Sequence, residues 1–330
     1  MKLRVTTFNC ENLFGRYRFL DIAPEKKKDG YESQIQIYEI IALEEGRTGR
    51  LKPKPIAEAQ RRNTAAAILT AEPDILCVAE VENLLALRLF NARYLENYFD
   101  RIVLVDGNDP RGIDVGILVK RGLKADILRI ASHADDAKDG GILPTTNRLD
   151  ARNCLGNAVF SRDCLEVDIG VGRRKLTLLA NHFKAQDGKP ASTAKRLIQS
   201  KRVLDIVKAC RRRETLPVVL GDLNVDSKGS QYDGSLDPLL HSRLLSDPFA
   251  SIAQEKKWTH YYSSKRSVSR LDYILVDSEL EDGVVGTEVF RGGLSPNCPK
   301  KHYDGERVGT IEEDKLEASD HCPVTVTLSL

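Results

Sequence analysis

The sequence lacks any apolar run long enough to cross a membrane. A transmembrane helix needs roughly 18 to 20 consecutive apolar residues, and the 330 residues contain no such run. The first predicted strand begins at Leu3, and no apolar signal-peptide region precedes it. We therefore expect no membrane span and no stable membrane association. The expected location is cytoplasmic, or extracellular if a signal peptide has been removed.

Closely spaced cysteines are missing as well. The seven cysteines are scattered along the chain, and no two have the CxxC spacing of redox or zinc motifs. An odd, dispersed set is typical of reduced thiols that are mostly small buried residues in a cytoplasm-like compartment. The pattern therefore argues against a zinc cluster.

Neither an internal repeat nor a low-complexity linker divides the chain. The composition, with 41% hydrophobic and 30% charged residues, is typical of a soluble globular protein. Residues 15–56 and 291–319 are polar and irregular, as in long surface insertions, and a helix is expected at Tyr38–Glu45. We predict a single domain over residues 1–330, and a monomer.

Charge is nearly balanced overall, so the net charge of +2 says little about a partner. Residues 184–213 carry ten Lys or Arg against two Asp, a net charge of +8. Residues 304–320 carry seven acids against two bases, a net charge of −5. Either stretch can be a solvated surface, but a basic stretch near a phosphate-cleaving site would attract a phosphate backbone.

Short apolar strands alternate with amphipathic helices. Strands are predicted at Leu3–Phe8, Ile75–Ala79, Val115–Val119, Cys164–Ile169, Leu176–Ala180, Pro217–Leu220, Tyr273–Val276 and Val324–Leu328. Helices are predicted at Ala57–Thr70 and Thr193–Cys210, the second with Leu197, Leu204 and Val207 on one stripe. This order favours an α/β or α+β arrangement of layers.

Polar side chains stand at the ends of these strands. They are Asn9, Glu11, Glu80, His182, Asp222, Asn224, Asp272, Asp320 and His321. Taken singly, each has an ordinary explanation; Asp222 after Gly221 is common in turns, and His182 alone would be a satisfied core histidine. Together they indicate a site built on strand ends. Carboxylates that face one another repel unless a cation holds them, and oxygen ligands without thiolates favour Mg²⁺ or Mn²⁺.

Eight motifs in order give the site a family resemblance. They are TTFNCEN, CVAEVEN, RGIDVGIL, FSRDCLEVDI, LANHFKA, VLGDLN, SRLDYIL and ASDHCPVTVTL. The series resembles that of the endonuclease/exonuclease/phosphatase superfamily, in its deoxyribonuclease-like bacterial branch. It spans residues 3–330 apart from the two insertions. The resemblance implies a four-layer α-β-β-α sandwich of two mostly antiparallel sheets, which aligned sheet packing accommodates.

The resemblance also implies roles on the metal and phosphate side. Glu80 matches the family's metal-binding glutamate, and Asp320 closes the metal side. Asn9 matches an asparagine that contacts metal or phosphate, and Asn224 matches one that holds the phosphate. Arg162 resembles the arginine that grips phosphate, where a planar fork suits two oxygens.

The remaining implied roles concern proton transfer. Asp222 matches the aspartate that orients or deprotonates water, and His182 and His321 match the two histidines that flank the scissile phosphate. Asp272 is the matching carboxylate partner of His321, and Asp114 is the expected partner of His182.

Other polar residues in the motifs have no direct role in this scheme. Glu11 departs from the pattern and is expected only to support the ligands, and Glu82 and Asn83 are expected in surface or turn roles.

These features predict a metal-dependent phosphodiesterase, best described as a DNA endonuclease or broad nuclease with nucleic acid as its partner. A histidine at position 182 argues against an abasic-site endonuclease, which has tyrosine there. One alternative is a phosphoesterase acting on a phospholipid head group or small phosphate ester, which would need an exposed apolar hairpin. Another is a non-catalytic phosphate-binding module, which would have lost a motif.

Overall fold

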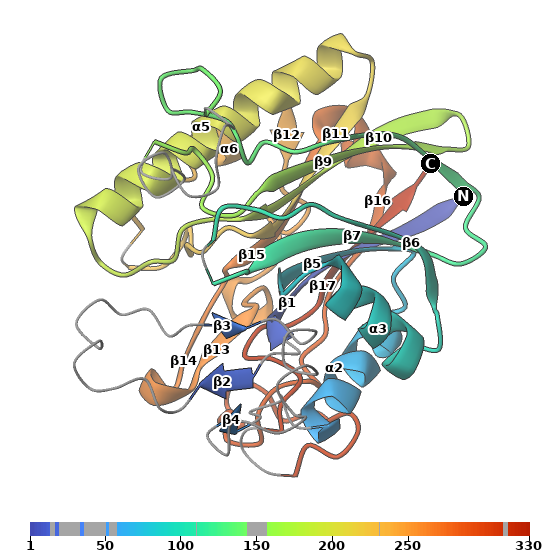
Figure 1. The fold of residues 1–330 in the computed structure, drawn as a ribbon, viewed down its shortest axis with the longest axis vertical. Coiled ribbons are helices and arrows are strands. Elements are labelled where there is room, and N and C mark those ends of the chain that lie inside the picture. The colour runs from blue at the N-terminus through green and yellow to red at the C-terminus, as the bar shows by residue number, and fades with distance from the viewer. Residues whose placement is uncertain are drawn as a thin grey trace.

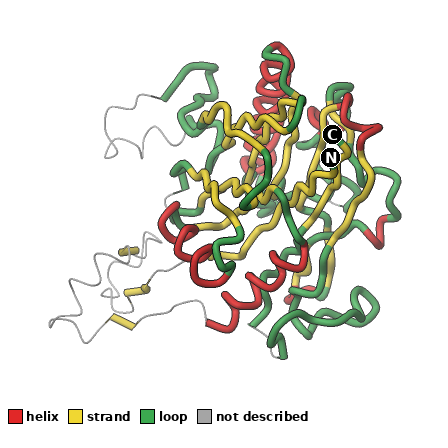
Figure 2. The backbone as a smooth tube through the Cα atoms, turned by 90° about the vertical axis from the view of Figure 1, so that its right-hand side faces the viewer, coloured by secondary structure: helices red, strands yellow, loops and turns green. Residues whose placement is uncertain are grey.

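A computed structural model of the chain describes residues 1–13, 17–19, 34–35, 51–52, 58–109, 111–143, 157–230, 232–312 and 316–330. Within these ranges two six-stranded sheets lie face to face, and helices cover both outer faces (Figure 1). The four-layer α/β sandwich predicted from the sequence is confirmed. The two chain ends lie side by side, since the amino group of Met1 donates to the carbonyl of Leu330 at 2.7 Å (Figure 2).

The first sheet has the strand order β16-β17-β1-β5-β7-β6. Its strands are β1 (Lys2–Leu13), β5 (Ile75–Val81), β6 (Phe99–Leu104), β7 (Asp114–Lys120), β16 (Val284–Val289) and β17 (Val324–Ser329). The second sheet has the order β12-β15-β11-β10-β9-β8. Its strands are β8 (Ala125–Ala131), β9 (Cys164–Val171), β10 (Arg174–His182), β11 (Leu216–Asp222), β12 (Leu245–Ser246) and β15 (Asp272–Asp277).

All eight predicted strands are present in these sheets. In each sheet one central pair, β1 with β5 and β10 with β11, is parallel, and the other pairs are antiparallel. The sequence patterns did not reveal the edge strands β6, β8, β12 and β16. Edge strands are often polar or short, because one of their two long edges has no neighbouring strand and faces solvent.

Apolar side chains fill the space between the sheets. Val5 and Cys77 of the first sheet meet Val167 and Leu178 of the second in one buried cluster. The opposite face of β5 is apolar too, and its side chains pack against helices. This explains the unbroken apolar run at Ile75–Ala79 of β5, since a strand covered on both faces has no polar side.

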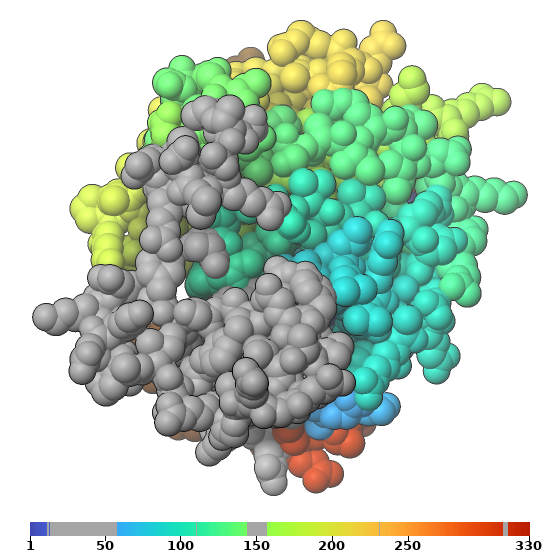
Figure 3. All heavy atoms as spheres, in the orientation of Figure 1, coloured from blue at the N-terminus to red at the C-terminus, as the bar shows by residue number. Residues whose placement is uncertain are grey.

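Two helices, α2 (Glu58–Ala71) and α3 (Leu84–Tyr94), cover the first sheet, and α3 lies on the surface drawn in Figure 3. Helix α3 was not predicted from the sequence, although Asn83 marks its start. The Asn83 side chain accepts a hydrogen bond from the amide of Ala86 at 2.9 Å. Asn83 is therefore the half-buried N-cap residue of α3. A surface or turn role was expected for Glu82, and the surface alternative is wrong because that residue is buried.

The second sheet is covered by α5 (Pro190–Arg212) and the short α6 (Asp237–Leu240). The predicted apolar stripe of α5 is displaced: Val203, Ile206, Val207 and Cys210 are buried, whereas Leu197 and Leu204 are half-buried. No helix among the described residues is long and apolar enough to cross a membrane.

Much of the basic stretch 184–213 lies in α5, and several of its arginines are paired within the protein. The pairs are Arg196–Asp233, Arg202–Asp136, Arg211–Asp277 and Arg213–Glu166. Internal acids therefore offset part of the charge that the sequence analysis considered for attracting a phosphate backbone.

The polar segments predicted as insertions differ in how far the structure describes them. Of residues 15–56, the described pieces form a small sheet of order β3-β2-β4, with β2 at Tyr17–Phe19, β3 at Gln34–Ile35 and β4 at Leu51–Lys52. The helix expected at Tyr38–Glu45 lies outside the described residues. Residues 291–319, where described, contain turns without helix or strand.

The cysteines agree with the expectation of small buried thiols. Cys154 lies outside the described residues, and the other six are buried and free. No disulfide joins any of the described cysteines, and they do not gather into one cluster.

A partly buried ionic cluster joins the loop after β8 to the second sheet. His133 lies between two carboxylates, 3.0 Å from Asp136 and 2.8 Å from Glu166. Burial opposes the imidazolium charge, but the bonds to these carboxylates outweigh it and raise the pKa of His133 to about 9. The cluster therefore contributes to stability as long as His133 stays protonated.

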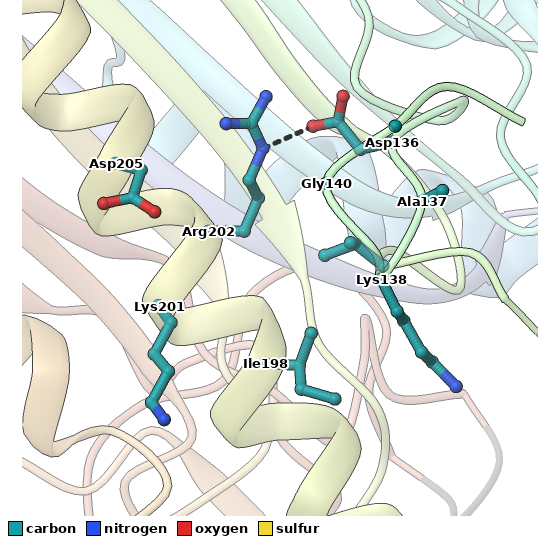
Figure 4. A pocket seen from close by; sticks show the side chains of 10 residues that line it. Asp136, Ala137, Lys138, Gly140, Ile198, Lys201, Arg202 and Asp205 are labelled. Carbon is teal, nitrogen blue, oxygen red and sulfur yellow. Dashed lines mark hydrogen bonds and ion pairs between the residues drawn. The ribbon is translucent and has the colours of Figure 1, made fainter.

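A cavity of about 330 Å³ lies beside this cluster, between α5 and the loop at residues 136–141 (Figure 4). Arg202 lines it and is held by Asp136 at 2.7 Å, so this guanidinium is already paired. None of the residues predicted for the site lines this cavity. It is a gap between a loop and a helix rather than part of the predicted site.

Candidate active site

The predicted site residues meet at one edge of the sandwich because of the strand directions. The carboxyl ends of β1, β5, β10 and β11 bring Asn9, Glu80, His182 and Asp222 to this edge. Strands β15 and β17 run antiparallel to their neighbours, so the chain enters them at the same edge. This entry places Asp272, Asp320 and His321 opposite the first group.

Asp222 lies at the centre of the cluster and is buried. Its Oδ2 accepts hydrogen bonds from the side-chain amides of Asn9 at 3.0 Å and Asn224 at 3.1 Å. The same oxygen is 3.6 Å from Nε2 of His182 and 3.8 Å from Nε2 of His321. One carboxylate oxygen is thus surrounded by two amides and two imidazoles.

His321 is oriented by Asp272, as predicted. Nδ1 of His321 lies 2.8 Å from Oδ2 of Asp272, and Thr259 donates its hydroxyl hydrogen bond to the same oxygen at 2.7 Å. Both members of the pair are buried. Nε2 of His321 is left to face the cluster, where it also lies 3.9 Å from Asp320.

His182 does not pair with Asp114, so this predicted contact is wrong. Asp114 accepts a hydrogen bond from the amide of Gly107 at 2.7 Å, and burial raises the pKa of Asp114 to about 7. Nδ1 of His182 is buried without a hydrogen-bond partner, and its Nε2 lies 3.8 Å from Glu80. The loop at residues 105–109 holds Asp114 at the start of β7, so Asp114 is committed elsewhere.

The backbone around the site adopts conformations that are unusual for residues other than glycine. Glu11, Glu80 and Asn224 have φ values of 47°, 62° and 57°. Glu80 is the extra residue of a bulge, because Ala79 and Val81 pair with consecutive residues of β7. Such bulges turn a side chain out of the strand pattern, and backbone strain of this kind gathers at functional sites.

Gly221, just before Asp222, is required by close backbone packing. Its φ is 131°, and a Cβ there would lie 1.9 Å from the carbonyl oxygen of Asn181 on β10. Only glycine allows β10 and β11 to approach so closely at this point. That approach brings Asp222 level with His182.

Arg162 is engaged with the protein rather than open to solvent. Its Nε is 3.1 Å from a carboxylate oxygen of Asp109, and one terminal nitrogen donates to the carbonyl of Phe183 at 3.1 Å. Arg111, which the sequence analysis did not single out, binds Asp109 through two nitrogens at 3.0 and 2.8 Å and is largely exposed. Asp109 thus holds two guanidinium groups beside the cluster.

His260 is another neighbour that the sequence analysis missed. Its Nε2 is 3.4 Å from Asp320, and its ring centre is 4.7 Å from that of His321. Glu11 contacts the same segment by accepting a hydrogen bond from the amide of Asp320 at 3.0 Å. The signal for His260 was available, since THYY and SVS flank a polar turn as in a hairpin.

The two central histidines have opposite protonation tendencies. Burial, with the charges of Arg162 and His321, lowers the pKa of His182 well below its ordinary value. Burial also opposes charge on His321, but Asp272 and Asp222 raise the pKa of His321 well above its ordinary value. Burial raises the pKa of Asp222 to about 7. The shifts favour the neutral form of His182 and the charged form of His321, on either side of a carboxyl group whose pKa is raised to about 7.

The donor set suits a hard divalent cation. Two groups of three described side chains have ligand atoms within 4.8 Å of one another: His260, Asp320 and His321, and Asp222, Asp272 and His321. Burial raises the pKa of Glu80, with Asp320 adding to the effect, and burial and Asp320 raise the pKa of Glu11 to about 8. A cation would stabilise the charged forms of these buried glutamates beside Asp320, so the residues fit Mg²⁺ or Mn²⁺.

Fold and site together define a four-layer α/β sandwich with an acid–imidazole site at one edge of its two sheets. The model of the Endonuclease/Exonuclease/phosphatase family matches residues 7–321, and the chain belongs to this family. Its members are typically hydrolases of phosphoesters and generally depend on a divalent metal.

Solved structures show the same fold at low sequence identity. A Bacteroides vulgatus endonuclease/exonuclease/phosphatase is 14% identical with a TM-score of 0.60, covering 100% of this chain and 99% of its own. D. rerio TDP2 with a single-strand DNA product is 14% identical with a TM-score of 0.56, covering 100% and 99%. The human Nocturnin catalytic domain with bound sulfate is 14% identical with a TM-score of 0.56, covering 99% and 94%. Comparison with curated proteins finds no match.

Proposed function

We propose that the protein is a divalent-metal-dependent phosphodiesterase that hydrolyses the nucleic-acid backbone, with DNA the preferred substrate. The observation that carries this proposal is the setting of Asp222. Its Oδ2 lies within 4 Å of two imidazole nitrogens and is held by two amides. Such a setting places a proton acceptor, one cationic imidazole and one uncharged imidazole around one small space.

Asp222 is proposed to align the attacking water and accept its proton. A pKa of about 7 suits this task, because a general base works best when its pKa is near the working pH. Asn9 and Asn224 hold the carboxylate in place through their amides. Removal of these bonds would leave the buried carboxylate free to turn away from the water.

The two histidines are proposed to act on the phosphate in different ways. His321, kept charged by Asp272, neutralises the charge that develops on the phosphate and can donate a proton to the leaving oxygen. His182, neutral because it is buried, binds a phosphate oxygen as an uncharged partner. Arg162 lies within electrostatic reach of Asp222 and adds positive charge on this side.

The carboxylates of Glu80 and Asp320, with the amide of Asn9, are proposed to hold the divalent metal. A bound Mg²⁺ would supply Lewis-acid stabilisation of the phosphate charge. Glu11 supports Asp320 by accepting a hydrogen bond from the backbone amide of Asp320. Positive φ values at Glu11 and Glu80 fit side chains that are held in position for a ligand.

Structural neighbours support a nucleic-acid substrate, since TDP2 of D. rerio was crystallised with a single-strand DNA product. A phospholipid substrate is the second candidate, and it would need an exposed apolar hairpin. The exposed hairpin next to the site has a polar tip of Ser263, Ser264, Lys265, Arg266 and Ser267, which disfavours that candidate. A non-catalytic module is disfavoured because Asp222, His182, His321 and Asp272 come together with their polar atoms facing one another.

A substrate panel tests the proposal. Plasmid DNA, single-stranded DNA, RNA, sphingomyelin and bis-p-nitrophenyl phosphate are each incubated with Mg²⁺, Mn²⁺ or EDTA. We expect metal-dependent cleavage of the nucleic acids and the small diester, and no cleavage in EDTA. Release of a phosphorylated head group from sphingomyelin, with DNA and RNA left intact, would overturn the proposal in favour of the lipid substrate.

A further inference from the structure

A hairpin grows directly out of the candidate active site. Strands β13 (His260–Tyr262) and β14 (Ser267–Ser269) form a two-stranded sheet outside both large sheets, and it extends away from them (Figure 1). Its base is fixed to the segment that carries His321. The amide of Tyr261 donates to the carbonyl of Asp320 at 2.9 Å, and an isolated bridge joins His260 to His321.

The two faces of β13 differ in what they contact. Tyr261 points inward, packs among Trp258 and Cys322, and is buried. His260 and Tyr262 lie on the opposite face, as the alternation of a strand requires. Their ring centres are 6.3 Å apart with planes only 23° apart, and the His260 ring lies 4.7 Å from that of His321.

His321, His260 and Tyr262 thus form a row of rings, here called the ring row, that leads outward from the proposed catalytic histidine. The inner members are fixed: His260 contacts Asp320 at 3.4 Å and Ser269 at 3.2 Å. The outer member is open, since 46% of the Tyr262 surface is exposed. The row therefore ends in a solvent-facing aromatic ring on a fixed base.

The hairpin tip beyond the ring row is cationic and polar. Lys265 and Arg266 are both exposed, and Nζ of Lys265 lies 5.6 Å from the centre of the Tyr262 ring. A cation–π contact at so exposed a position is weak, so it can give way to a ligand ring. An exposed ring next to two positive charges is the combination that binds a base and its phosphate.

We infer that the ring row and hairpin tip form a subsite for an unpaired nucleotide next to the scissile phosphate. The base stacks on Tyr262, while Lys265 and Arg266 contact the flanking phosphates. In a duplex the faces of each base are covered by its neighbours, so this subsite favours single-stranded DNA or frayed ends over intact duplex. The inference rests on the proposed nuclease function and names the form of its substrate.

A membrane surface is the other class of partner that an exposed hairpin can meet. Membrane-docking elements place Trp, Phe or Leu in the interface. The tip from Ser263 to Ser267 has no large apolar residue, and Tyr262 is the single exposed aromatic residue of β13. The observations therefore favour a nucleic acid, and vesicle binding becomes an outcome of the test.

The test compares variants of Tyr262 on substrates with and without bases. The substrates are a short single-stranded DNA, an oligomer of equal length built on base-free spacers, and bis-p-nitrophenyl phosphate. Three variants are compared. Tyr262→Ala removes the ring, Tyr262→Phe keeps it, and the double variant Lys265→Ala/Arg266→Ala removes both charges of the tip. The matched control is Lys175→Ala, an exposed lysine near the far end of β10, roughly 20 Å from His182 along the strand.

We expect Tyr262→Ala to lower kcat/KM on single-stranded DNA relative to the small diester by about 5- to 150-fold, the usual range for loss of one base–aromatic stack. The loss should lie in KM and be absent on the base-free oligomer, and Tyr262→Phe should resemble the parent. The Lys265/Arg266 variant should weaken binding of both oligomers and flatten the salt dependence. The Lys175→Ala variant should change neither oligomer binding nor its salt dependence.

Three results would overturn the inference. They are an unchanged ratio for Tyr262→Ala, an equal loss on the base-free oligomer, and a loss of binding to anionic phospholipid vesicles with DNA cleavage unaffected. A parent enzyme that hydrolyses the small diester but cleaves no nucleic acid would overturn the proposed function itself. A parent that cleaves DNA while Tyr262→Ala changes nothing would remove the subsite alone.

Discussion

Replacing Asp272 with asparagine perturbs the pair that orients His321. The carboxylate is fully buried, lies 2.8 Å from Nδ1 of His321, and also accepts from Thr259. Asparagine keeps the shape but loses the charge that raises the pKa of His321, and its amide can turn a donor toward the donor Nδ1–H. Hydrogen bonds to charged groups contribute about 1.5–3 kcal/mol, or roughly 10- to 150-fold.

The expected loss in kcat is therefore at least about 10-fold. It reaches about 10²–10⁴-fold if proton transfer by His321 fails altogether. Because burial opposes charge on His321 and Asp272 offsets it, the pH range in which His321 is charged should move downward in Asp272→Asn. Steady-state hydrolysis of bis-p-nitrophenyl phosphate as a function of pH measures both effects. Thermal unfolding serves as the control for folding.

A double-mutant cycle gives the refuting result. Residues that act as a unit lose activity non-additively, so Asp272→Asn combined with His321→Ala should be about as slow as His321→Ala alone. If the two losses multiply, Asp272 does not act through His321 and the proposed pair is wrong. A loss confined to KM would show instead that the pair only binds substrate.

Three other substitutions test separate parts of the structure. Glu80→Gln should abolish metal-dependent turnover without lowering the unfolding temperature, because a buried carboxylate charge is costly without a cation; full activity at saturating Mg²⁺ would exclude its role. His133→Gln should lower the free energy of unfolding by about 3 kcal/mol below about pH 6.5. The difference should shrink as the pH rises through about 9, because the parent histidine loses its proton there. A pH-independent difference in urea titrations would refute this. Gly221→Ala should destabilise the fold by more than about 4 kcal/mol, since the added Cβ would clash with the carbonyl oxygen of Asn181. A denaturant midpoint like that of the parent would contradict the packing described.

The strands that build the sandwich were predictable because both faces of the sheets are covered. Runs such as Ile75–Ala79 are apolar at every position, and that pattern leaves little ambiguity. Edge strands such as β8 mix exposed and buried positions, and their pattern does not separate them from loops. Helix α3 was missed even though Asn83 and a run of good helix formers mark it.

The pairing of Asp272 with His321 was inferred correctly, whereas that of Asp114 with His182 was not. Asp272 begins a strand that reaches the same sheet edge as the segment carrying His321, so strand order brings them together. Asp114 is captured by the amide of Gly107, a contact that depends on the shape of a loop. Local sequence pattern does not encode such loop contacts.

Arg111 and His260 were missed for a similar reason. Arg111 acts through Asp109, which is two residues earlier in the same loop. His260 acts through Asp320, which is close in the fold but far away in the sequence. Their side chains lie outside the strand-end pattern on which the prediction relied. A search for hairpins would have found His260, since polar turn residues separate two short alternating runs.

The central claim is that the carboxylate of Asp222 drives phosphodiester hydrolysis at this sheet edge. The most direct measurement is cleavage of plasmid DNA in Mg²⁺ under single-turnover conditions by the parent and by Asp222→Asn. Asp282→Asn, an exposed carboxylate changed in the same way, is the matched control. The account predicts a loss of about 10²–10⁴-fold for Asp222→Asn with normal folding, and no loss for the control. Cleavage by Asp222→Asn at the parent rate would contradict it.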